Sequence, residues 1–585
     1  MIRTILKQLK EFKKIAVISP MFMIGEVICE MIIPILMGQI VDRGIYGKDL
    51  GYIGMSGVKM VIVAVAGLAF GMLGAYTRAV AGAGLAKNLR KSMYDNIQTF
   101  SFANIDRFST SGLVTRMTTD VTNIQNAFQM ILSMAFRAPG SMIVAMCLSF
   151  YLSPKLASIY LVSVIFLATV MMGMMRTTNR YFKEVFEKYD ELNESVQENV
   201  SAIRVVKAYV REDHEISRFD KAADNIYRMF IRAEKRVITI GPLMTATVYT
   251  CILLISWLGA RMIVGVGGVS TLTTGELMSL LTYCMNILMS LMMVSIIFVM
   301  MTMSEASARR IAEVINEETT LKNPEDPVME VKDGSIVFED VEFAYSSGSE
   351  EPVLKDIDLE IKSGERIGII GGTGSAKSSL VNLISRLYDV TAGRVLVGGV
   401  DVRDYDMEVL REQVSVVLQK NVLFSGTIYE NLRWGDPDAT DEECRRACRL
   451  ACADGFIENM PEGYETRIEQ GGTNVSGGQK QRLCIARALL KKPKILILDD
   501  STSAVDTATD AKIRKAFEEE IPDTTTLMIA QRVSSVEHCD RIIVMDNGRI
   551  NGFGTHEELL AGNDIYREVY ESQTGGDRDF DEKEK

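Results

Sequence analysis

The sequence predicts two domains of different class: an α-helical membrane domain with about six spans, followed by an α/β domain with a phosphate-binding loop. Long apolar runs are concentrated before about residue 305, whereas short β-type runs alternate with helical patterns after about residue 330. The composition agrees, because 47% hydrophobic and 24% charged residues coexist in a chain of 585 residues. Apolar and charged residues are therefore expected in different parts of the chain.

The overall charge excludes one class of partner. The chain has 64 Lys and Arg residues against 76 Asp and Glu residues, which gives a net charge of −12. A nucleic-acid binder is expected to carry a basic surface instead. We therefore expect no nucleic acid among the partners.

The apolar runs are long enough to cross a membrane. A helix needs about 18–20 apolar residues to span the hydrocarbon layer, and it is the form that satisfies its own backbone there. Residues 15–41 form one such run, interrupted only by Glu26 and Glu30. Five others contain no Asp, Glu, Lys or Arg: Met60–Thr77, Ala138–Pro154, Leu156–Met175, Val237–Ala260 and Leu277–Ser304. The sequence thus predicts about six membrane helices.

Charge also predicts the orientation. The N-terminal segment MIRTILKQLKEFKK is basic, so we expect it on the cytoplasmic side of a plasma membrane. Two long charged stretches, residues 78–121 and 176–236, are then cytoplasmic as well. Their helical periodicity indicates that membrane helices continue tens of ångströms beyond the bilayer. The alternative is that each stretch forms a separate cytosolic domain.

Composition shifts mark the domain boundaries. We expect a membrane domain over residues 1–315 and a polar linker with two prolines over residues 316–330. A nucleotide-binding domain should follow over residues 331–573. The charged tail, residues 574–585, is predicted to be disordered.

Three charged residues lie within or beside the apolar runs. Glu26 and Glu30 are four residues apart and therefore share one helix face. They could attract cationic drugs or peptides, pair with a cation of a partner chain, or be paired structurally. Arg137 precedes an apolar run, so we expect its side chain to extend toward the inner membrane interface.

A glycine-rich loop after a predicted strand is the strongest local signal. The run ERIGII leads into the loop, and the apolar helix LVNLISRLY follows it. Glycines let backbone N–H groups converge on phosphate oxygens, Lys377 adds a positive charge, and Ser378 would reach Mg²⁺. We therefore expect a nucleotide and Mg²⁺ at the residues of this loop: Gly371, Gly372, Thr373, Gly374, Ser375, Ala376, Lys377, Ser378 and Ser379.

One loop residue departs from the usual pattern. Ala376 occupies the position at which the pattern has its last glycine. A methyl group is tolerated there if the backbone has a negative φ, and it is unfavourable if a positive φ is required.

A second strand-like run, residues 494–498, ends in two carboxylates. Asp499 and Asp500 follow the loop by about 120 residues. An acidic pair at the end of a strand beside a phosphate-binding loop suits Mg²⁺ coordination and positioning of a water molecule.

Further motifs resemble a known family. The segment Val475–Arg482 (VSGGQKQR) resembles the signature motif of ATP-binding cassette (ABC) proteins. Tyr345 resembles the aromatic residue that stacks on adenine, Gln419 the Q-loop glutamine, and Ser503–Asp506 the D-loop. In the membrane half, DRFSTSGLVTRMTTDVTNIQ and RVVKAYVREDHEISRF resemble the intracellular loops of ABC exporters. The resemblance covers nearly the whole chain and implies a half-transporter of the ABC exporter fold.

The family resemblance implies that two half-transporters pair head to tail. Each ATP would then lie between the phosphate-binding loop of one subunit and the signature motif of the other. Mg²⁺ would be held through Ser378, Gln419 and Asp499. The remaining implied nucleotide contacts are Tyr345, Ser476, Gly477, Gly478, Gln479 and Asp506.

Two catalytic positions depart from the family pattern. Asp500 stands where the family has the Glu that orients the attacking water, and Gln531 stands where it has a His. A carboxylate withdrawn by about 1 Å misplaces the water, which costs about 100-fold in rate. Gln can donate a hydrogen bond but carries no imidazolium charge. Both changes belong to the site built on this chain's own phosphate-binding loop, whereas its signature motif is intact.

These departures predict one subunit of a heterodimer. Its own site would hold ATP for a long time, and its signature motif would complete the competent site of the partner. The expected activity is ATP-driven export of amphipathic drugs, lipids or peptides by alternating access. The alternatives are a homodimeric slow ATPase or lipid flippase, and a regulatory or gating ABC subunit. An importer is disfavoured, because importers of the family usually keep the two domains on separate chains.

Overall fold

The computed structural model describes residues 1–264, 272–345, 351–500 and 505–574. The chain separates into two compact units. The first contains Met1–Gln98 and Thr110–Glu317, and the second contains Thr99–Ser109 together with the chain from Glu318 onward. A short segment in the first third of the sequence is therefore part of the C-terminal unit.

The described residues of the first unit form helices joined by short connections. Two of its segments are single π-helical turns, η2 (Ile40–Ile45) and η3 (Arg116–Asp120). A 3₁₀ turn, η1 (Lys10–Phe12), precedes the first long helix. The α-helices are α1 (Ile2–Lys7), α2 (Lys13–Gln39), α3 (Leu50–Ile97), α5 (Thr110–Thr115), α6 (Val121–Leu152), α7 (Pro154–Ser201), α8 (Ile203–Ala208), α9 (Glu212–Ile238), α10 (Ile240–Val264) and α11 (Thr274–Asn316).

Six helical segments of this unit are long and apolar enough to cross a membrane, which agrees with the six predicted spans. They are Lys10–Ile45, Leu50–Ile97, Thr110–Leu152, Pro154–Met174, Ile240–Val264 and Thr274–Val294. The predicted class of this domain is confirmed.

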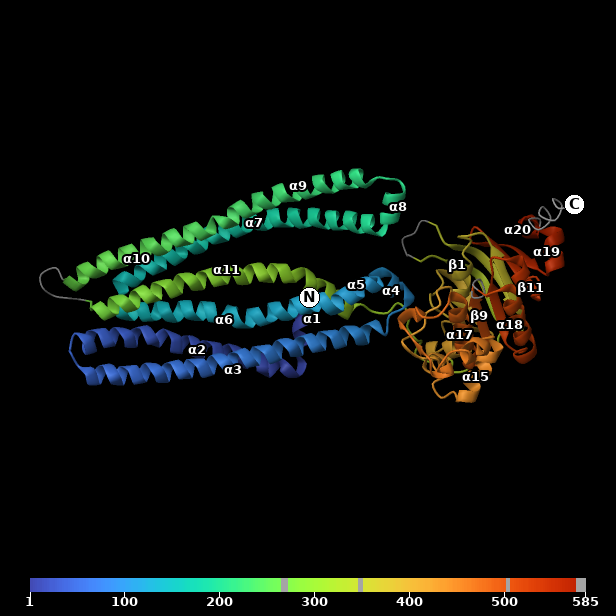
Figure 1. Cartoon of the computed structure of the whole chain (residues 1–585), viewed down its shortest axis with the longest axis horizontal. Helices are drawn as coiled ribbons and strands as arrows, with labels where there is room; N and C mark the ends of the chain where they lie inside the picture. The colour runs from blue at the N-terminus through green and yellow to red at the C-terminus, as the bar shows by residue number, and fades with distance from the viewer. Residues whose placement is uncertain (265–271, 346–350, 501–504, 575–585) are drawn as a thin grey trace. The chain divides into compact units, whose positions relative to one another are not determined.

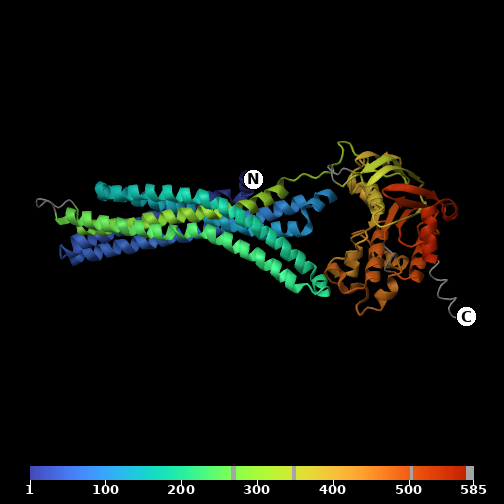
Figure 2. The ribbon, with the colours of Figure 1, turned by 90° about the horizontal axis from the view of Figure 1, so that it is seen from above.

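The charged stretches continue the membrane helices. Helices α3 and α7 have 48 residues each, which corresponds to about 72 Å of helix. Helix α9 returns beside α7, as both views show (Figures 1 and 2). The alternative of separate globular domains in these stretches is wrong for the residues that the structure describes.

The expectation for Arg137 is also wrong. Its guanidinium bridges α6 to α2 by pairing with both acids of the first span. One nitrogen lies 2.6 Å from Oε1 of Glu26, and another lies 3.0 Å from Oε2 of Glu30. Two carboxylates four residues apart on one helix face fit the fork of a guanidinium, which binds oxygen acceptors in its own plane. Of the alternatives for Glu26 and Glu30, structural pairing is the one that the geometry matches.

The second unit is an α/β domain with three sheets. One sheet has the strand order β2-β1-β4-β5, a second has the order β12-β11-β3-β10-β9-β6, and a third pairs β7 with β8. The strands are β1 (Ile336–Phe343), β2 (Leu354–Ile361), β3 (Arg366–Gly371), β4 (Ala392–Val397), β5 (Val400–Asp401), β6 (Val414–Val417), β7 (Gly426–Thr427), β8 (Arg467–Ile468), β9 (Ile495–Asp499), β10 (Thr525–Ile529), β11 (Arg541–Asp546) and β12 (Arg549–Gly554).

The second unit also contains ten described α-helices. In chain order they are α4 (Phe102–Phe108), α12 (Lys377–Ile384), α13 (Met407–Gln413), α14 (Ile428–Leu432), α15 (Asp441–Leu450), α16 (Asp454–Glu458), α17 (Gly477–Leu490), α18 (Thr507–Glu520), α19 (His556–Gly562) and α20 (Asp564–Thr574). Short 3₁₀ turns occur at η4 (Gly463–Glu465), η5 (Gln470–Gly472) and η6 (Val533–Ser535).

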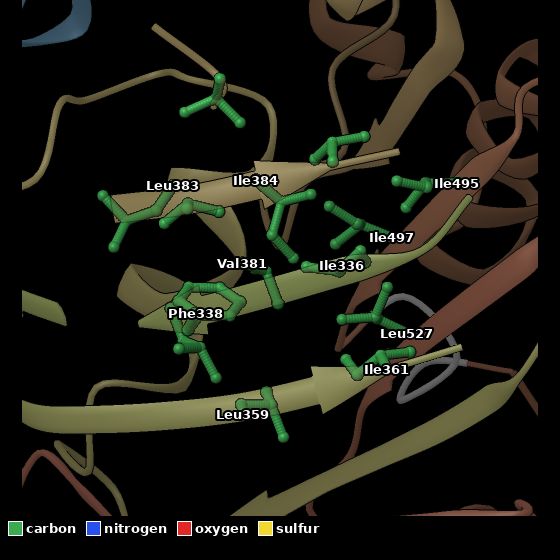
Figure 3. Close-up of a cluster of buried hydrophobic side chains, with 14 of the residues drawn as sticks. Ile336, Phe338, Leu359, Ile361, Val381, Leu383, Ile384, Ile495, Ile497 and Leu527 are labelled. Atoms are coloured by element: carbon green, nitrogen blue, oxygen red, sulfur yellow. The ribbon is translucent and has the colours of Figure 1, made fainter. Parts of the chain in front are cut away.

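Strand β9 separates two hydrophobic cores. All five of its residues are buried, and successive side chains of a strand point to opposite faces. Ile495 and Ile497 join the core that contains α12 and the β1-β2-β4 sheet (Figure 3). Leu496 and Leu498 join the core that contains α15 and α17. Helices α12 and α17 therefore lie on opposite faces of the same sheet.

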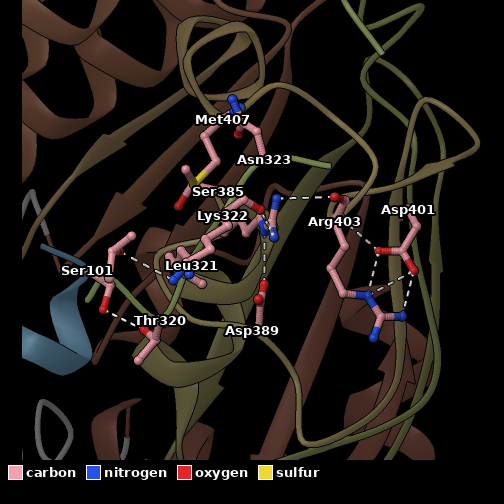
Figure 4. Close-up of polar contacts among 12 residues, drawn as sticks. Ser101, Thr320, Leu321, Lys322, Asn323, Ser385, Asp389, Asp401, Arg403 and Met407 are labelled. Carbon is pink, nitrogen blue, oxygen red and sulfur yellow. Dashed lines mark hydrogen bonds and ion pairs between the residues drawn. The ribbon is translucent and has the colours of Figure 1, made fainter. Parts of the chain in front are cut away.

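Within the second unit, a buried arginine anchors the segment that follows α11. Arg386 is 4% exposed and pairs with Asp389 at 2.9 Å. It also donates to the carbonyl oxygens of Lys322, at 3.1 Å, and Arg403, at 3.2 Å (Figure 4). Because a buried guanidinium must have its donors satisfied, this arrangement fixes the path of the connection.

Replacement of Arg137 tests the intramembrane ion group. Arg137→Met leaves two carboxylates without their cation. We expect it to lower the free energy of unfolding by about 1–3 kcal/mol, less than for a fully buried pair because the three side chains are partly exposed. Thermal unfolding in detergent measures the change.

The matched control removes the acids as well. A triple variant, Arg137→Met with Glu26→Gln and Glu30→Gln, should regain most of the lost stability, because no uncompensated charge remains. Equal melting temperatures for the single and triple variants would contradict the pairing.

Candidate nucleotide-binding site

Parallel strand pairing brings the predicted phosphate-binding residues to one edge of the six-stranded sheet. Ile369 of β3 lies opposite Ile529 of β10, and Ile529 lies opposite Asp499 of β9. On the other side of β9, Val417 of β6 lies opposite Leu498. All four strands run in the same direction, so their carboxyl ends meet at this edge, which is where open α/β sheets bind ligands.

The residues beyond these strand ends are those that the sequence predicted. The glycine-rich loop follows β3, and the acidic pair stands at the end of β9. Gln531 follows β10 by two residues and Gln419 follows β6 by two residues, and both side chains are exposed. The fold therefore gathers the loop, both acids and both glutamines at one edge.

The loop depends on glycine where the backbone passes a neighbouring strand. A Cβ on Gly371 would lie 2.2 Å from the carbonyl oxygen of Met545 in β11, so no side chain fits there. Gly374 has a φ of +84°, a conformation that favours glycine. Cβ atoms on Gly372 and Gly374 would meet nothing within 4 Å. These two glycines are exposed, so nothing in the protein crowds this part of the loop.

Lys377 begins helix α12 and turns back over the loop. Its ammonium donates to the carbonyl oxygens of Gly371 and Gly372, both at 2.8 Å, and contacts Ser375 Oγ at 3.2 Å. Burial lowers the pKa of Lys377, and the carboxylates of Asp499 and Asp500 oppose that shift. The cation thus lies within the curve of the loop and faces the acidic pair.

Ala376 adopts the unfavourable one of its two possible conformations. Its φ is +71° and its ψ is +24°, so it lies in the left-handed region directly before α12. For a residue with a Cβ this conformation costs about 1 kcal/mol or more. The loop therefore contains a strained residue where the usual pattern has glycine.

Two of the three groups expected at Mg²⁺ are already in contact. Ser378 hydrogen-bonds Asp499, whose side chain is buried at the end of β9. Burial raises the pKa of Asp499, the hydrogen bond from Ser378 opposes that rise, and the neighbouring carboxylate of Asp500 adds to it. A nearby cation would favour the ionised form. A hydroxyl and a carboxylate beside a phosphate loop fit the oxygen preference of Mg²⁺.

The two residues that depart from the family pattern are bonded to each other. The amide of Gln531 donates to Oδ2 of Asp500 at 2.8 Å. The backbone of Asp500 is fixed as well, because its N–H donates to the carbonyl of Ile529 and its own carbonyl accepts from Gln481. The Asp500 carboxylate is therefore held by an amide donor, in a short side chain on a fixed backbone.

Tyr345 lies beside the first turn of α12. Its hydroxyl is 2.8 Å from Ser379 Oγ, and its ring is about half exposed. Two further aromatic rings pack edge-on against it, Phe343 with centroids 4.8 Å apart and Tyr388 at 5.1 Å. An exposed ring next to the phosphate loop is placed to stack on a nucleotide base.

Sequence reasoning missed the residues behind this ring. The hydroxyl of Tyr388 donates to Oδ2 of Asp106 in helix α4 at 2.7 Å, and its ring lies 6.0 Å from that of Phe102. Burial raises the pKa of the Tyr388 phenol, and the Asp106 carboxylate adds to the rise. These partners are 282 positions apart, so no local spacing could have identified the pair.

The signature motif caps the helix on the other face of the sheet. The hydroxyl of Ser476 accepts from the backbone N–H of Gln479 at 3.3 Å, and the Gln479 side chain accepts from the N–H of Ser476 at 2.9 Å. Gly477 and Gly478 form the first turn of α17. This reciprocal cap fixes the start of the helix, on the face opposite α12.

Part of the predicted D-loop lies outside the described residues, which resume at Val505. Asp506 caps helix α18 by accepting from the backbone N–H of Thr509 at 2.9 Å. This hydrogen bonding lowers the pKa of Asp506.

Comparison with protein families agrees with both halves of this description. Residues 17–292 match the ABC transporter transmembrane region, and residues 354–503 match the family described as ABC transporter. The ABC transporter ATP-binding protein YfiB of Bacillus subtilis (strain 168) is 35% identical over 567 residues, which covers 97% of this chain and 98% of the relative.

Two other relatives have names that indicate a cargo. The ATP-dependent lipid A-core flippase of Desulfotalea psychrophila (strain LSv54 / DSM 12343) is 30% identical over 92% of this chain and 93% of its own. A Staphylococcus aureus (strain NCTC 8325 / PS 47) protein named for multidrug export is 33% identical over 83% of each chain.

A solved structure matches the complete fold. A bacterial Atm1-family ABC exporter with ATP bound superposes with a TM-score of 0.80, covering 97% of this chain and 98% of that one at 22% identity. The predicted fold class, a six-span membrane domain with an α/β nucleotide-binding domain, is confirmed.

Substitution of Ala376 tests the strain in the loop. Ala376→Gly should raise the unfolding free energy by about 1 kcal/mol, because glycine tolerates the left-handed conformation. The control, Ala511→Gly in the exposed part of α18, should lower it by about the same amount. The measurement is the difference in melting temperature between each variant and the parent. A lower melting temperature for Ala376→Gly would show that Ala376 is not strained.

Substitution of Tyr345 tests the base-stacking role. If adenine stacks on this ring, Tyr345→Ala should weaken ATP binding by about 5- to 150-fold, the range for loss of a base–aromatic stack. Tyr345→Phe keeps the ring and loses the hydroxyl contact to Ser379, so it should bind ATP nearly as the parent does. Titration calorimetry with ATP measures both. Unchanged affinity in Tyr345→Ala would exclude stacking.

Proposed function

We propose that this chain, which belongs to the ABC transporter family as an exporter-type half-transporter with fused membrane and nucleotide-binding domains, is one subunit of a heterodimeric exporter. The observation that carries the proposal is the hydrogen bond between Asp500 and Gln531. Both departures from the family pattern meet at one site, beside this chain's own phosphate-binding loop. A loss confined to one site is the pattern of an assembly with one slow and one competent site.

The chain's own site is suited to holding ATP. Backbone N–H groups of the loop and the Lys377 ammonium would bind the phosphates. Ser378 and Asp499, together with Gln419, would hold Mg²⁺, which neutralises phosphate charge when bound. Tyr345 would stack on the base. All of these groups are retained, so binding is preserved.

The same site is poorly suited to cleaving ATP. A water molecule must be held in line with the terminal phosphate by a correctly placed acceptor. The Asp500 carboxylate is one methylene shorter than the Glu of the family, and one of its oxygens already accepts from Gln531. The side-chain amide of Gln531 donates a hydrogen bond to Asp500 and carries no positive charge. ATP would therefore remain bound for a long time.

The signature motif of this chain would serve the partner's site. Ser476 and Gly478 stand at the N-terminus of α17, a helix of 14 residues, where the backbone dipole and free N–H groups favour an anion. Across a head-to-tail interface, the motif from Ser476 to Gln479 would face the terminal phosphate of ATP on the partner's loop. The partner would supply the Glu and His that this chain lacks.

Transport would proceed by alternating access in a plasma membrane. The basic N-terminus and the nucleotide-binding domain would be cytoplasmic, following the positive-inside rule. The relatives named for lipid A-core flipping and multidrug export support an amphipathic cargo. A lipid-flipping homodimer is the second candidate. The flippase relative favours it, and Asp500 retains a carboxylate that could support slow hydrolysis at two identical sites.

Hydrolysis by the chain alone tests the assignment. The purified chain should hydrolyse ATP slowly. The double variant Asp500→Glu with Gln531→His should raise the rate by about 100-fold, because the longer Glu side chain extends the carboxylate by about 1 Å toward the attacking water. Lys377→Ala in the same background is the control and should abolish the gain. Vigorous hydrolysis by the unmodified chain would contradict the degenerate site.

A second test compares the same change in the two subunits of the heterodimer. In the co-purified heterodimer, loss of the partner's catalytic Glu should stop turnover. The corresponding change here, Asp500→Asn, should leave most of the turnover intact. Equal losses from both changes would favour the homodimer-like alternative, in which the two sites work equally.

A further inference from the structure

A groove lies beneath the N-terminal helix α1 in the helical unit. It encloses about 490 Å³, within the range of pockets that hold small molecules. Four elements line it, with Ile5 and Leu6 from α1, Leu85 from α3, Ala127 and Ile131 from α6, and Met301 from α11. All of its described lining residues belong to the helical unit.

The groove lies where the apolar spans pass into the charged stretches. Ile131 precedes the apolar run that begins at Ala138 by seven residues, which is about 10 Å along a helix. Met301 belongs to the last turn of the apolar run Leu277–Ser304, and α1 directly precedes the first span. The groove is therefore at the level of one membrane–water interface.

Positive charge is concentrated in the chain that forms and directly follows α1. Within the first 14 residues the only acid is Glu11, against five cations: Arg3, Lys7, Lys10, Lys13 and Lys14. Arg3 and Lys7 are exposed and flank the lining residues Ile5 and Leu6. The carboxylate in the lining, Glu305, is balanced by Arg309 at 3.5 Å.

We propose that the groove binds an acyl chain of an anionic glycerophospholipid, whose phosphate is held by Arg3 and Lys7. Such a lipid matches both halves of the site. Its chain suits the apolar lining, and its headgroup suits a basic segment at the membrane surface, where each Lys or Arg strengthens binding to anionic lipid. A cationic amphipath would instead meet the exposed charges of Arg3 and Lys7 at the same place. This inference is independent of the degenerate ATP site.

A tryptophan probe in the groove tests the proposal. Met301→Trp places the reporter on a lining residue that is about half exposed. The complete transporter is reconstituted in nanodiscs of phosphatidylcholine containing one quarter brominated phosphatidylglycerol, or one quarter brominated phosphatidylcholine. The parent, with its exposed membrane residue Trp257, gives the quenching by bulk lipid. Phosphatidylglycerol should quench the added tryptophan more strongly than phosphatidylcholine.

Two variants separate the headgroup from the chain. Arg3→Gln with Lys7→Gln should weaken the preference for phosphatidylglycerol by roughly 30-fold, at about fivefold for each basic residue. The matched control, Lys59→Gln with Lys155→Gln, removes two exposed lysines at the opposite ends of the spans and should keep the preference. Ala127→Leu adds bulk inside the groove and should reduce quenching by both lipids.

Three outcomes would overturn the proposal. Equal quenching by both headgroups would remove the anionic selectivity. Equal effects of the two charge variants would remove the role of Arg3 and Lys7. Quenching of Met301→Trp no stronger than in the parent would indicate that protein, such as helices of the second subunit, covers the groove.

Discussion

The site depends on one constraint: the in-register parallel pairing of β3, β10, β9 and β6. Strand β9 is buried on both faces, so it has no freedom to slide or tilt against its neighbours. Asp499 at its end is therefore fixed relative to the loop after β3, through the shared neighbour Ile529. The hydrogen bond from Ser378 is a consequence of that frame. The phosphate-binding loop, both acids and both glutamines are positioned from the same sheet edge.

A rigid frame makes side-chain length decisive. The Asp500 backbone is bonded to Ile529 and Gln481, so it cannot advance to compensate for a shorter carboxylate. The amide of Gln531 donates to that carboxylate, so the two altered residues are bonded to each other. The strained Ala376 lies in the loop of the same pocket. The departures from the family pattern at Ala376, Asp500 and Gln531 therefore lie where the backbone is too rigid to compensate for a changed side chain.

Sequence patterns were informative wherever the determinant is local. Apolar run length predicted the six spans, and a strand–glycine–helix context predicted the phosphate loop from Gly371 to Ser379. The conformation of Ala376 was left open, because φ at that position depends on the folded path of the loop into α12 and not on the residue type. The contacts of Arg137 with Glu26 and of Tyr388 with Asp106 join positions 111 and 282 residues apart. Only the packed fold determines which distant groups meet.

The membrane acids illustrate how such a contact changes an interpretation. Alone, Glu26 and Glu30 form an acidic face that would attract cations from the cargo. With Arg137 bound to both, a cationic cargo must first displace a guanidinium that already makes two charge-assisted hydrogen bonds. Displacement would also separate α2 from α6 and expose unpaired charge to an apolar surrounding. The geometry therefore favours a structural role for the ion group, which holds two spans together.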